Sequence, residues 1–155
     1  MRFVLLDRIT SLEPGRSGRA RKTVAFSEDY FDDHFPSRPI MPGVLILEGM
    51  AQISGLVLEE GMRERGSRIK ALMSIVEKAK FRKPARPGDC LEYSVGVQSM
   101  NDLGGKVKAT ASVEGHVVAE SLLVFTFHEF DNPRLETRQS EIVALLMKGS
   151  LCGEA

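Results

Sequence analysis

Residues 34–52 read HFPSRPIMPGVLILEGMAQ, a proline-rich loop that runs into a long apolar segment. Pro42 suits the first turn of a helix, where its missing N–H costs nothing, and Gly61 suits a helix end. In the helix that we predict over residues 42–62, apolar side chains cover nearly the whole circumference, which is typical of a helix buried on most sides. The polar side chains that enter it before its end are Glu48, Gln52 and Ser54.

Segments with the composition of β-strands flank this helix on both sides. Residues 3–12 and 18–26 precede it and are separated by Pro14-Gly15, a pair that favours a tight turn. Residues 69–81, 90–99, 106–114 and 116–127 follow it, and 106–113 alternate as a half-buried strand does. We therefore predict an α+β domain in which an antiparallel sheet curls around one long central helix.

The chain length and the distribution of turn residues predict one main domain over residues 1–130 and a tail over 131–155. Asn132-Pro133 breaks the last strand, and residues 140–148 form a short amphipathic pattern. We expect a short helix there, packed on the outer sheet or at a subunit contact, and a frayed end over 149–155.

The composition, with 43% hydrophobic residues and a formal net charge of zero, gives no electrostatic reason to expect nucleic acid or a charged membrane as a partner. No apolar run reaches the about 18–20 residues of a membrane span, and the start does not resemble a signal peptide, so we expect a cytoplasmic protein. Cys90 and Cys152 lie far apart, which argues against a disulfide framework and against a metal site.

Few side chains are suited to proton transfer in this sequence. Of three histidines, His34 immediately precedes the apolar helix, whereas His116 and His128 fall in a hairpin and at a strand end, where solvated side chains are common. Glu48 and Gln52 are four residues apart and share a helix face. Taken alone, Glu48 fits a structural carboxylate, and Gln52 fits either a support for Glu48 or a satisfied buried amide. Arg38 fits either a contact with a partner protein or an exposed, solvated side chain.

The segment from His34 to Gln52 closely resembles the signature of FabZ-type 3-hydroxyacyl-[acyl-carrier-protein] dehydratases. Residues 3–9, 77–84, 87–89 and 113–127 are also similar to this family, so the resemblance covers about residues 3–128. The family's usual segment before the first strand and a counterpart of the tail after Phe130 are not found. The family has the hotdog fold, in which an antiparallel sheet wraps a central helix, and the resemblance implies that fold here.

The resemblance implies a lyase that removes water from 3-hydroxyacyl thioesters and gives trans-2-enoyl thioesters, in fatty acid or related acyl-chain synthesis. The family's catalytic histidine falls on His34, and its catalytic glutamate falls on Glu48, where FabA-type enzymes, which also isomerise the product, carry aspartate. Imidazole, which titrates at about pH 6.5, suits the base that removes the C2 proton. Desolvation on an apolar helix favours the protonated carboxylic acid, which suits the donor to the C3 hydroxyl.

The family's thioester-binding backbone amide falls on Gly43, at a helix start where N–H groups have no intrahelical acceptor. The resemblance also implies an acyl carrier protein as partner, a substrate carried on its phosphopantetheine, and no cofactor or metal of the enzyme's own. It further implies a homodimer whose active sites take the histidine from one chain and the acid from the other. Whether such dimers assemble into a hexamer stays open.

Two other functions remain compatible with such a fold. One is a hotdog acyl thioesterase, which generally uses a carboxylate to direct water and lacks the combination of residues 34–36 with residues 41–43 seen here. The other is a non-catalytic acyl-thioester binding module, and the presence of both His34 and Glu48 argues against it. Release of a free thiol without an enoyl product would indicate the first, and binding without turnover would indicate the second.

Overall fold

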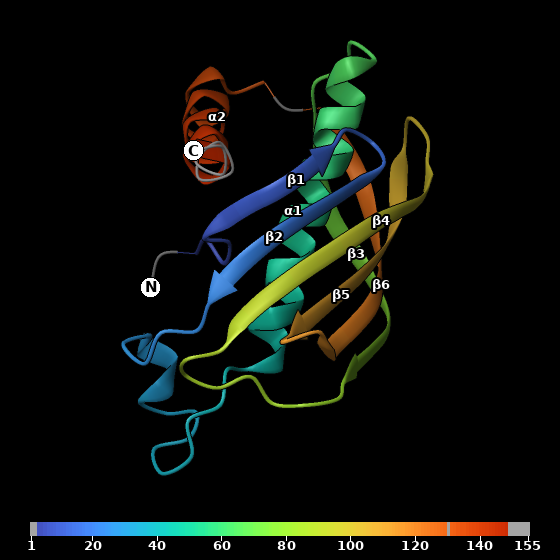
Figure 1. Cartoon of the computed structure of the whole chain (residues 1–155). Helices are drawn as coiled ribbons and strands as arrows, with labels where there is room; N and C mark the ends of the chain where they lie inside the picture. Colours follow the sequence, from blue (N-terminus) through green and yellow to red (C-terminus); the bar gives the residue numbers. More distant parts are fainter. Residues whose placement is uncertain (1–2, 130, 149–155) are drawn as a thin grey trace, which may run out of the picture.

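The computed structural model describes residues 3–129 and 131–148 and contains one antiparallel sheet, a long helix and a second helix after the sheet (Figure 1). The strands lie in the order β1-β2-β4-β5-β6-β3, and every neighbouring pair is antiparallel. The long helix α1 runs along one face of the curved sheet, as the sequence predicts. The elements are β1 (Arg8–Glu13), β2 (Ser17–Thr23), a 3-10 turn (Asp29–Phe31), α1 (Gly43–Glu64), β3 (Ile69–Phe81), β4 (Cys90–Met100), β5 (Gly104–Val113), β6 (His116–Glu129) and α2 (Pro133–Lys148).

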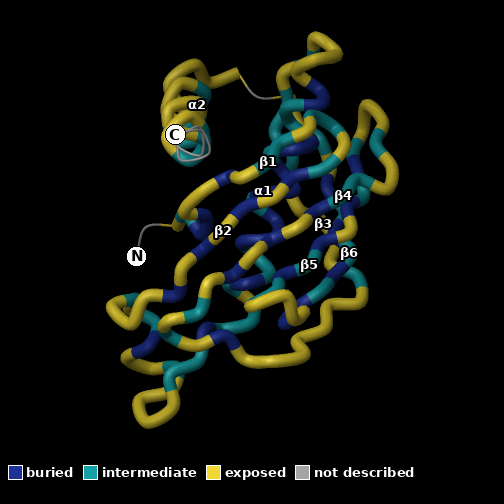
Figure 2. Tube along the Cα trace, in the orientation of Figure 1, coloured by how far each residue is buried: buried dark blue, intermediate teal, exposed yellow. Residues whose placement is uncertain are grey.

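The hydrophobic core lies between α1 and the concave face of the sheet (Figure 2). In β4 as far as Val95 and in β5 as far as Ala111, every second residue is buried, because alternate side chains of a strand point to opposite faces. The α1 side chains that meet them are mostly below 3% exposed, and they include Ile46, Met50, Ile53, Val57 and Leu58. Helix and sheet therefore bury one continuous apolar layer, which accounts for the α+β arrangement.

The sheet curls around α1 as predicted, but the expectation that this helix is buried on most sides is met only on the face toward the sheet. Val44 is 66% exposed, and Glu48 and Gln52 are only half-buried, although the helix is apolar over most of its circumference. The six-stranded sheet covers only part of α1. Residues 3–7 and α2 lie beside the uncovered face, which carries Glu48 and Gln52.

The end of α1 also differs from the prediction. Gly61 lies buried inside the helix, which continues to Glu64. Two residues later, Gly66 has a φ of +82°, which suits glycine and turns the chain away from the helix. Gly66 N–H donates to Arg63 O at 2.9 Å and Ser67 N–H donates to Met62 O at 3.0 Å, the pair of bonds that defines a Schellman motif.

Three other boundaries differ from the sequence prediction. The first strand begins at Arg8, and before it the Leu5 N–H bonds to the Gln52 side chain and not to a neighbouring strand. The second strand ends at Thr23. The helix α2 begins at Pro133 and not near residue 140, since Asn132 accepts the Leu135 N–H on its side chain and caps it.

The helix α2 packs beside β1, with Val143, Leu146 and Met147 against the core, and its Gln139 donates to Glu59 of α1. The predicted frayed end, residues 149–155, and with it Cys152, lies outside the described residues. Within residues 3–129 and 131–148, no helix is both long and apolar enough to cross a membrane.

Gly61 holds α1 against the turn between β1 and β2. A Cβ on Gly61 would lie 2.5 Å from Gly15 Cα, a distance that backbone atoms cannot accept. We expect Gly61→Ala to lower the free energy of unfolding by about 1–3 kcal/mol through overpacking, even though alanine is the better helix former. Urea denaturation followed by circular dichroism measures this.

Gly55→Ala is the matched control in the same helix. A Cβ on Gly55 meets its nearest neighbour at 3.8 Å, an ordinary contact. Because alanine gains helix propensity there, we expect the Gly55→Ala protein to be at least as stable as the wild type. Equal destabilisation by the two substitutions would contradict this account of the contact between Gly61 and Gly15.

Candidate active site

His34 is held by three hydrogen bonds in the loop before α1. Its backbone N–H donates to Tyr30 O at 2.9 Å, and its own carbonyl accepts the Ile40 N–H at 3.1 Å. The ring Nδ1 lies 2.7 Å from Ile40 O. A carbonyl oxygen only accepts, so Nδ1 carries a proton, and in the neutral ring Nε2 has the lone pair. The loop thus fixes the tautomer that a general base needs.

His34 opens onto a cavity of about 450 Å³ at the start of α1, which we call the histidine cavity. The carbonyl of Pro42 accepts the N–H groups of Leu45 and Ile46, so the amides of Gly43 and Val44 precede the first backbone hydrogen bond of the helix. A start of this kind carries the positive end of the helix dipole. The lining residues are His34, Ile40, Met41, Pro42, Gly43, Val44, Ile46, Phe81, Arg82, Lys83, Pro84 and Ala85.

Glycine is favoured at position 43 for packing, in addition to the thioester-binding role that the sequence suggests. A Cβ there would come within 2.8 Å of the Phe81 ring, the last residue of β3. The absence of a side chain therefore lets β3 close against the helix start. Gly43 also lines the histidine cavity.

Basic side chains lie beside this cavity at the end of β3. Arg82 donates to Glu120 Oε1 at 2.6 Å, and Lys80 lies 3.8 Å from the same oxygen. The hydrogen bond from Arg82 lowers the pKa of Glu120, which keeps that carboxylate charged. Arg38, the candidate partner contact of the sequence, is an exposed residue of the loop.

Glu48 faces a second, larger cavity of about 620 Å³, which we call the glutamate cavity. Gln52, one turn later, donates from Nε2 to Glu48 Oε1 at 3.1 Å. The Gln52 Oε1 accepts the N–H of the buried Leu5 at 2.9 Å. The Gln52 amide thus bonds both to the backbone and to the Glu48 carboxylate, and its support of Glu48 in catalysis stays a prediction.

The four predicted site residues form two pairs. His34 and Gly43 line the histidine cavity, and Glu48 and Gln52 line the glutamate cavity. Neither cavity contains both His34 and Glu48. Val44, one turn before Glu48, lines the histidine cavity, so the two cavities follow one another along α1. Within the described ranges, no group of three or more His, Cys, Asp or Glu side chains could hold a metal ion.

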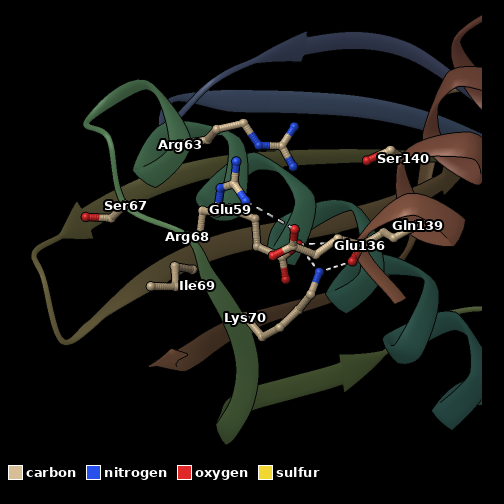
Figure 3. A pocket seen from close by; sticks show the side chains of 9 residues that line it. All are labelled: Glu59, Arg63, Ser67, Arg68, Ile69, Lys70, Glu136, Gln139 and Ser140. Atoms are coloured by element: carbon tan, nitrogen blue, oxygen red, sulfur yellow. Dashed lines mark hydrogen bonds and ion pairs between the residues drawn. The ribbon is translucent and has the colours of Figure 1, made fainter. Parts of the chain in front are cut away.

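The sequence did not predict the contribution of α2 to the glutamate cavity. Leu135, Ile142, Val143 and Leu146 line it. Its lining also includes a polar cluster in which Lys70 contacts both Glu59 and Gln139, and the same three residues line a smaller cavity of about 230 Å³ (Figure 3). The spacing of the α2 residues indicates an amphipathic helix, but the spacing alone does not identify the surface that their apolar stripe faces.

Comparison with known proteins identifies close relatives. A family model described as a FabA-like domain matches residues 1–122. A Clostridium botulinum protein named 3-hydroxyacyl-[acyl-carrier-protein] dehydratase FabZ is 42% identical over 123 residues, which cover 79% of this chain and 84% of the relative. A protein of the same name from Nitratiruptor is 44% identical over 126 residues, which cover 78% of this chain and 84% of the relative.

Solved structures agree on the fold. The dehydratase heterocomplex ApeI:P from Xenorhabdus doucetiae superposes with a TM-score of 0.66 at 16% identity, covering 87% of this chain and 88% of that chain. A Streptococcus mutans protein bound to acetyl CoA gives a TM-score of 0.62 at 17% identity, covering 81% of this chain and 90% of that chain. The arrangement of sheet and helix is the hotdog fold.

The hydrogen bonds of Gln52 generate a prediction about stability. Gln52→Leu removes the acceptor of the buried Leu5 N–H, and an unsatisfied buried donor costs about 1–3 kcal/mol. We expect that loss in urea denaturation and faster amide hydrogen exchange at Leu5. Gln98→Leu, at an exposed position of β4, is the control and should leave both measurements unchanged. Unchanged exchange at Leu5 in Gln52→Leu would refute the role of this bond.

Proposed function

The chain belongs to the FabA-like family, and on that premise we propose that it dehydrates 3-hydroxyacyl-[acyl-carrier-protein] thioesters with His34 as the base and Glu48 as the acid. The similarity to the FabZ dehydratases supports the reaction. One observation carries the assignment of the base: the bond from Nδ1 of His34 to Ile40 O leaves Nε2 as the proton acceptor. The products are a trans-2-enoyl thioester and water.

In the proposed mechanism, Nε2 of His34 removes a proton from C2 of the acyl chain. The electron pair of that C–H bond forms the C2–C3 double bond while the C3–O bond breaks. Glu48 gives its proton to the departing hydroxyl, which leaves as water. The proton balance closes with these two groups, so the proposal includes no metal or redox cofactor.

The thioester oxygen gains negative charge as the C2 proton leaves. We propose that the Gly43 amide, at the start of α1, donates to this oxygen. Removal of one such donor typically costs about 3 kcal/mol of transition-state stabilisation. Gln52 acts as a positioning residue, because it holds Glu48 from the next turn and is itself held by Leu5.

The separation of His34 from Glu48 into two cavities supports an active site shared between two copies of the chain. The edge strand β3 connects the cavities, with Phe81 at the histidine cavity and Leu72 and Met73 at the glutamate cavity. If two copies pair their β3 strands antiparallel, the histidine cavity of one lies beside the glutamate cavity of the other. We therefore propose a homodimer as the active unit.

The surface of β3 supports the same assembly. An unpaired edge strand presents free backbone groups, and natural proteins usually cover or blunt such edges. Here the edge also exposes large apolar side chains, which a second copy would bury. They are Leu72, Met73, Ile75, Val76 and Phe81, each between 38% and 54% exposed.

The reaction is tested by the ultraviolet absorbance of the enoyl thioester formed from 3-hydroxydecanoyl-acyl carrier protein. We expect His34→Ala and Glu48→Gln each to lower kcat by about 100- to 10,000-fold, since each removes one proton-transfer group. His116→Ala, which changes an exposed histidine, is the control and should retain activity. Near-normal rates in both site variants would exclude the mechanism. Release of free thiol without enoyl product would instead identify a thioesterase.

The shared site is tested by coexpressing His34→Ala chains with Glu48→Gln chains. A mixed dimer regains one intact site if the two groups come from different chains, so part of the activity should return. The control pairs His34→Ala with the double variant His34→Ala/Glu48→Gln, which cannot form an intact site in any dimer. If mixed dimers are shown to form and both mixtures are equally inactive, then His34 and Glu48 of one active site come from the same chain.

A further inference from the structure

The helix α2 covers the glutamate cavity on the side that the sheet leaves open. Its apolar stripe faces the cavity but is not fully buried: Ile142, Val143 and Leu146 are half-buried, and Leu135 is 48% exposed. Across from it lie apolar groups of α1, β3 and β6, including Ala51, Leu56, Leu72 and Phe125. The helix therefore leaves an apolar space beside α1, β3 and β6, although Val143 and Leu146 reach the core.

Polar contacts fix α2 at one end of this space. Lys70 of β3 donates to Glu59 Oε2 of α1 at 3.0 Å and also to Gln139 of α2, and Gln139 donates to Glu59 Oε2 at 2.8 Å. Glu136 adds an ion pair with Arg68 at 3.5 Å. Figure 3 shows these side chains converging between α1, β3 and α2. The cluster of Glu59, Lys70 and Gln139, here called the Lys70 cluster, forms a charged end wall.

The space runs from the proposed acid to this end wall. Glu48 and Glu59 both line the cavity and lie eleven residues apart on α1, which corresponds to about 16 Å of helix rise. A fully extended chain of single bonds advances roughly 1.2 Å per bond, so this length matches an acyl tail of about a dozen bonds. The volume of about 620 Å³ lies within the range of about 300–1,000 Å³ of small-molecule sites.

We propose that α2 is the outer wall of the acyl-chain pocket and that, with the Lys70 cluster, it limits the length of the acyl chain. This inference rests on the proposed function, because Glu48 as the acid at C3 places the remaining carbons at the mouth of this cavity. The apolar lining suits methylene groups, and the charged end wall disfavours a chain that would reach Glu59 and Lys70. Ile142 and Leu146 are then specificity-determining residues.

The test varies acyl length and the size of residue 142 in the full-length protein. The chain-length profile is kcat/KM for 3-hydroxyacyl-acyl carrier proteins from butyryl to palmitoyl. We expect Ile142→Trp to lower the ratio of decanoyl to butyryl activity by about tenfold or more, because the indole fills the pocket. Ile142→Ala should shift the profile toward longer chains. Leu145→Trp, on the exposed face of the same helix, is the matched control.

A binding measurement separates this inference from the proposed reaction. Isothermal titration calorimetry with saturated acyl-pantetheines of the same lengths gives affinities that do not depend on turnover. Opposite shifts by the two Ile142 substitutions, with none from Leu145→Trp, support α2 as the pocket wall even if no thioester is dehydrated, in which case only the proposed function fails. Length profiles that stay the same in all variants overturn the inference about α2 and leave a measured dehydration intact.

Discussion

The structure depends on the burial of one helix that is apolar over most of its circumference. The six-stranded sheet covers the face that carries Met50, Ile53 and Val57, and this burial holds helix and sheet together. A single curled sheet covers only part of a helix, so one face of α1 remains. The segment over residues 3–7, α2 and, in our proposal, a second copy of the chain share that face. The candidate active site lies where this cover is incomplete.

The start of α1 brings together three features from different parts of the chain: a loop histidine, the first helix amides and the end of β3. The loop presents the Nε2 of His34, the helix supplies the first amides, and β3 closes with Phe81 against Gly43. Each of these features is a local consequence of sequence, namely a histidine before a helix, a proline at its start and a glycine without a Cβ. Their juxtaposition depends on how the end of β3 packs on the helix.

The separation of His34 and Glu48 links function to assembly. Each group has its local support, Ile40 O for one and Gln52 for the other, yet they line different cavities. The exposed apolar edge of β3 gives the chain a physical reason to dimerise that is independent of catalysis. In the proposed dimer, the same edge that removes apolar surface from water also completes the site.

The sequence by itself determined the element order, the buried helix with Glu48 and Gln52 on one face, and the family, because these follow from periodicity and from the pattern over residues 34–52. It misplaced the end of α1 and the start of the second helix, since Gly61 packs against Gly15 and Asn132 caps α2. Only the tertiary structure decided that His34 and Glu48 line different cavities and that α2 covers one of them. Local patterns fix which side chains share a helix face, whereas the surface opposite that face depends on the packing of segments far apart in the chain.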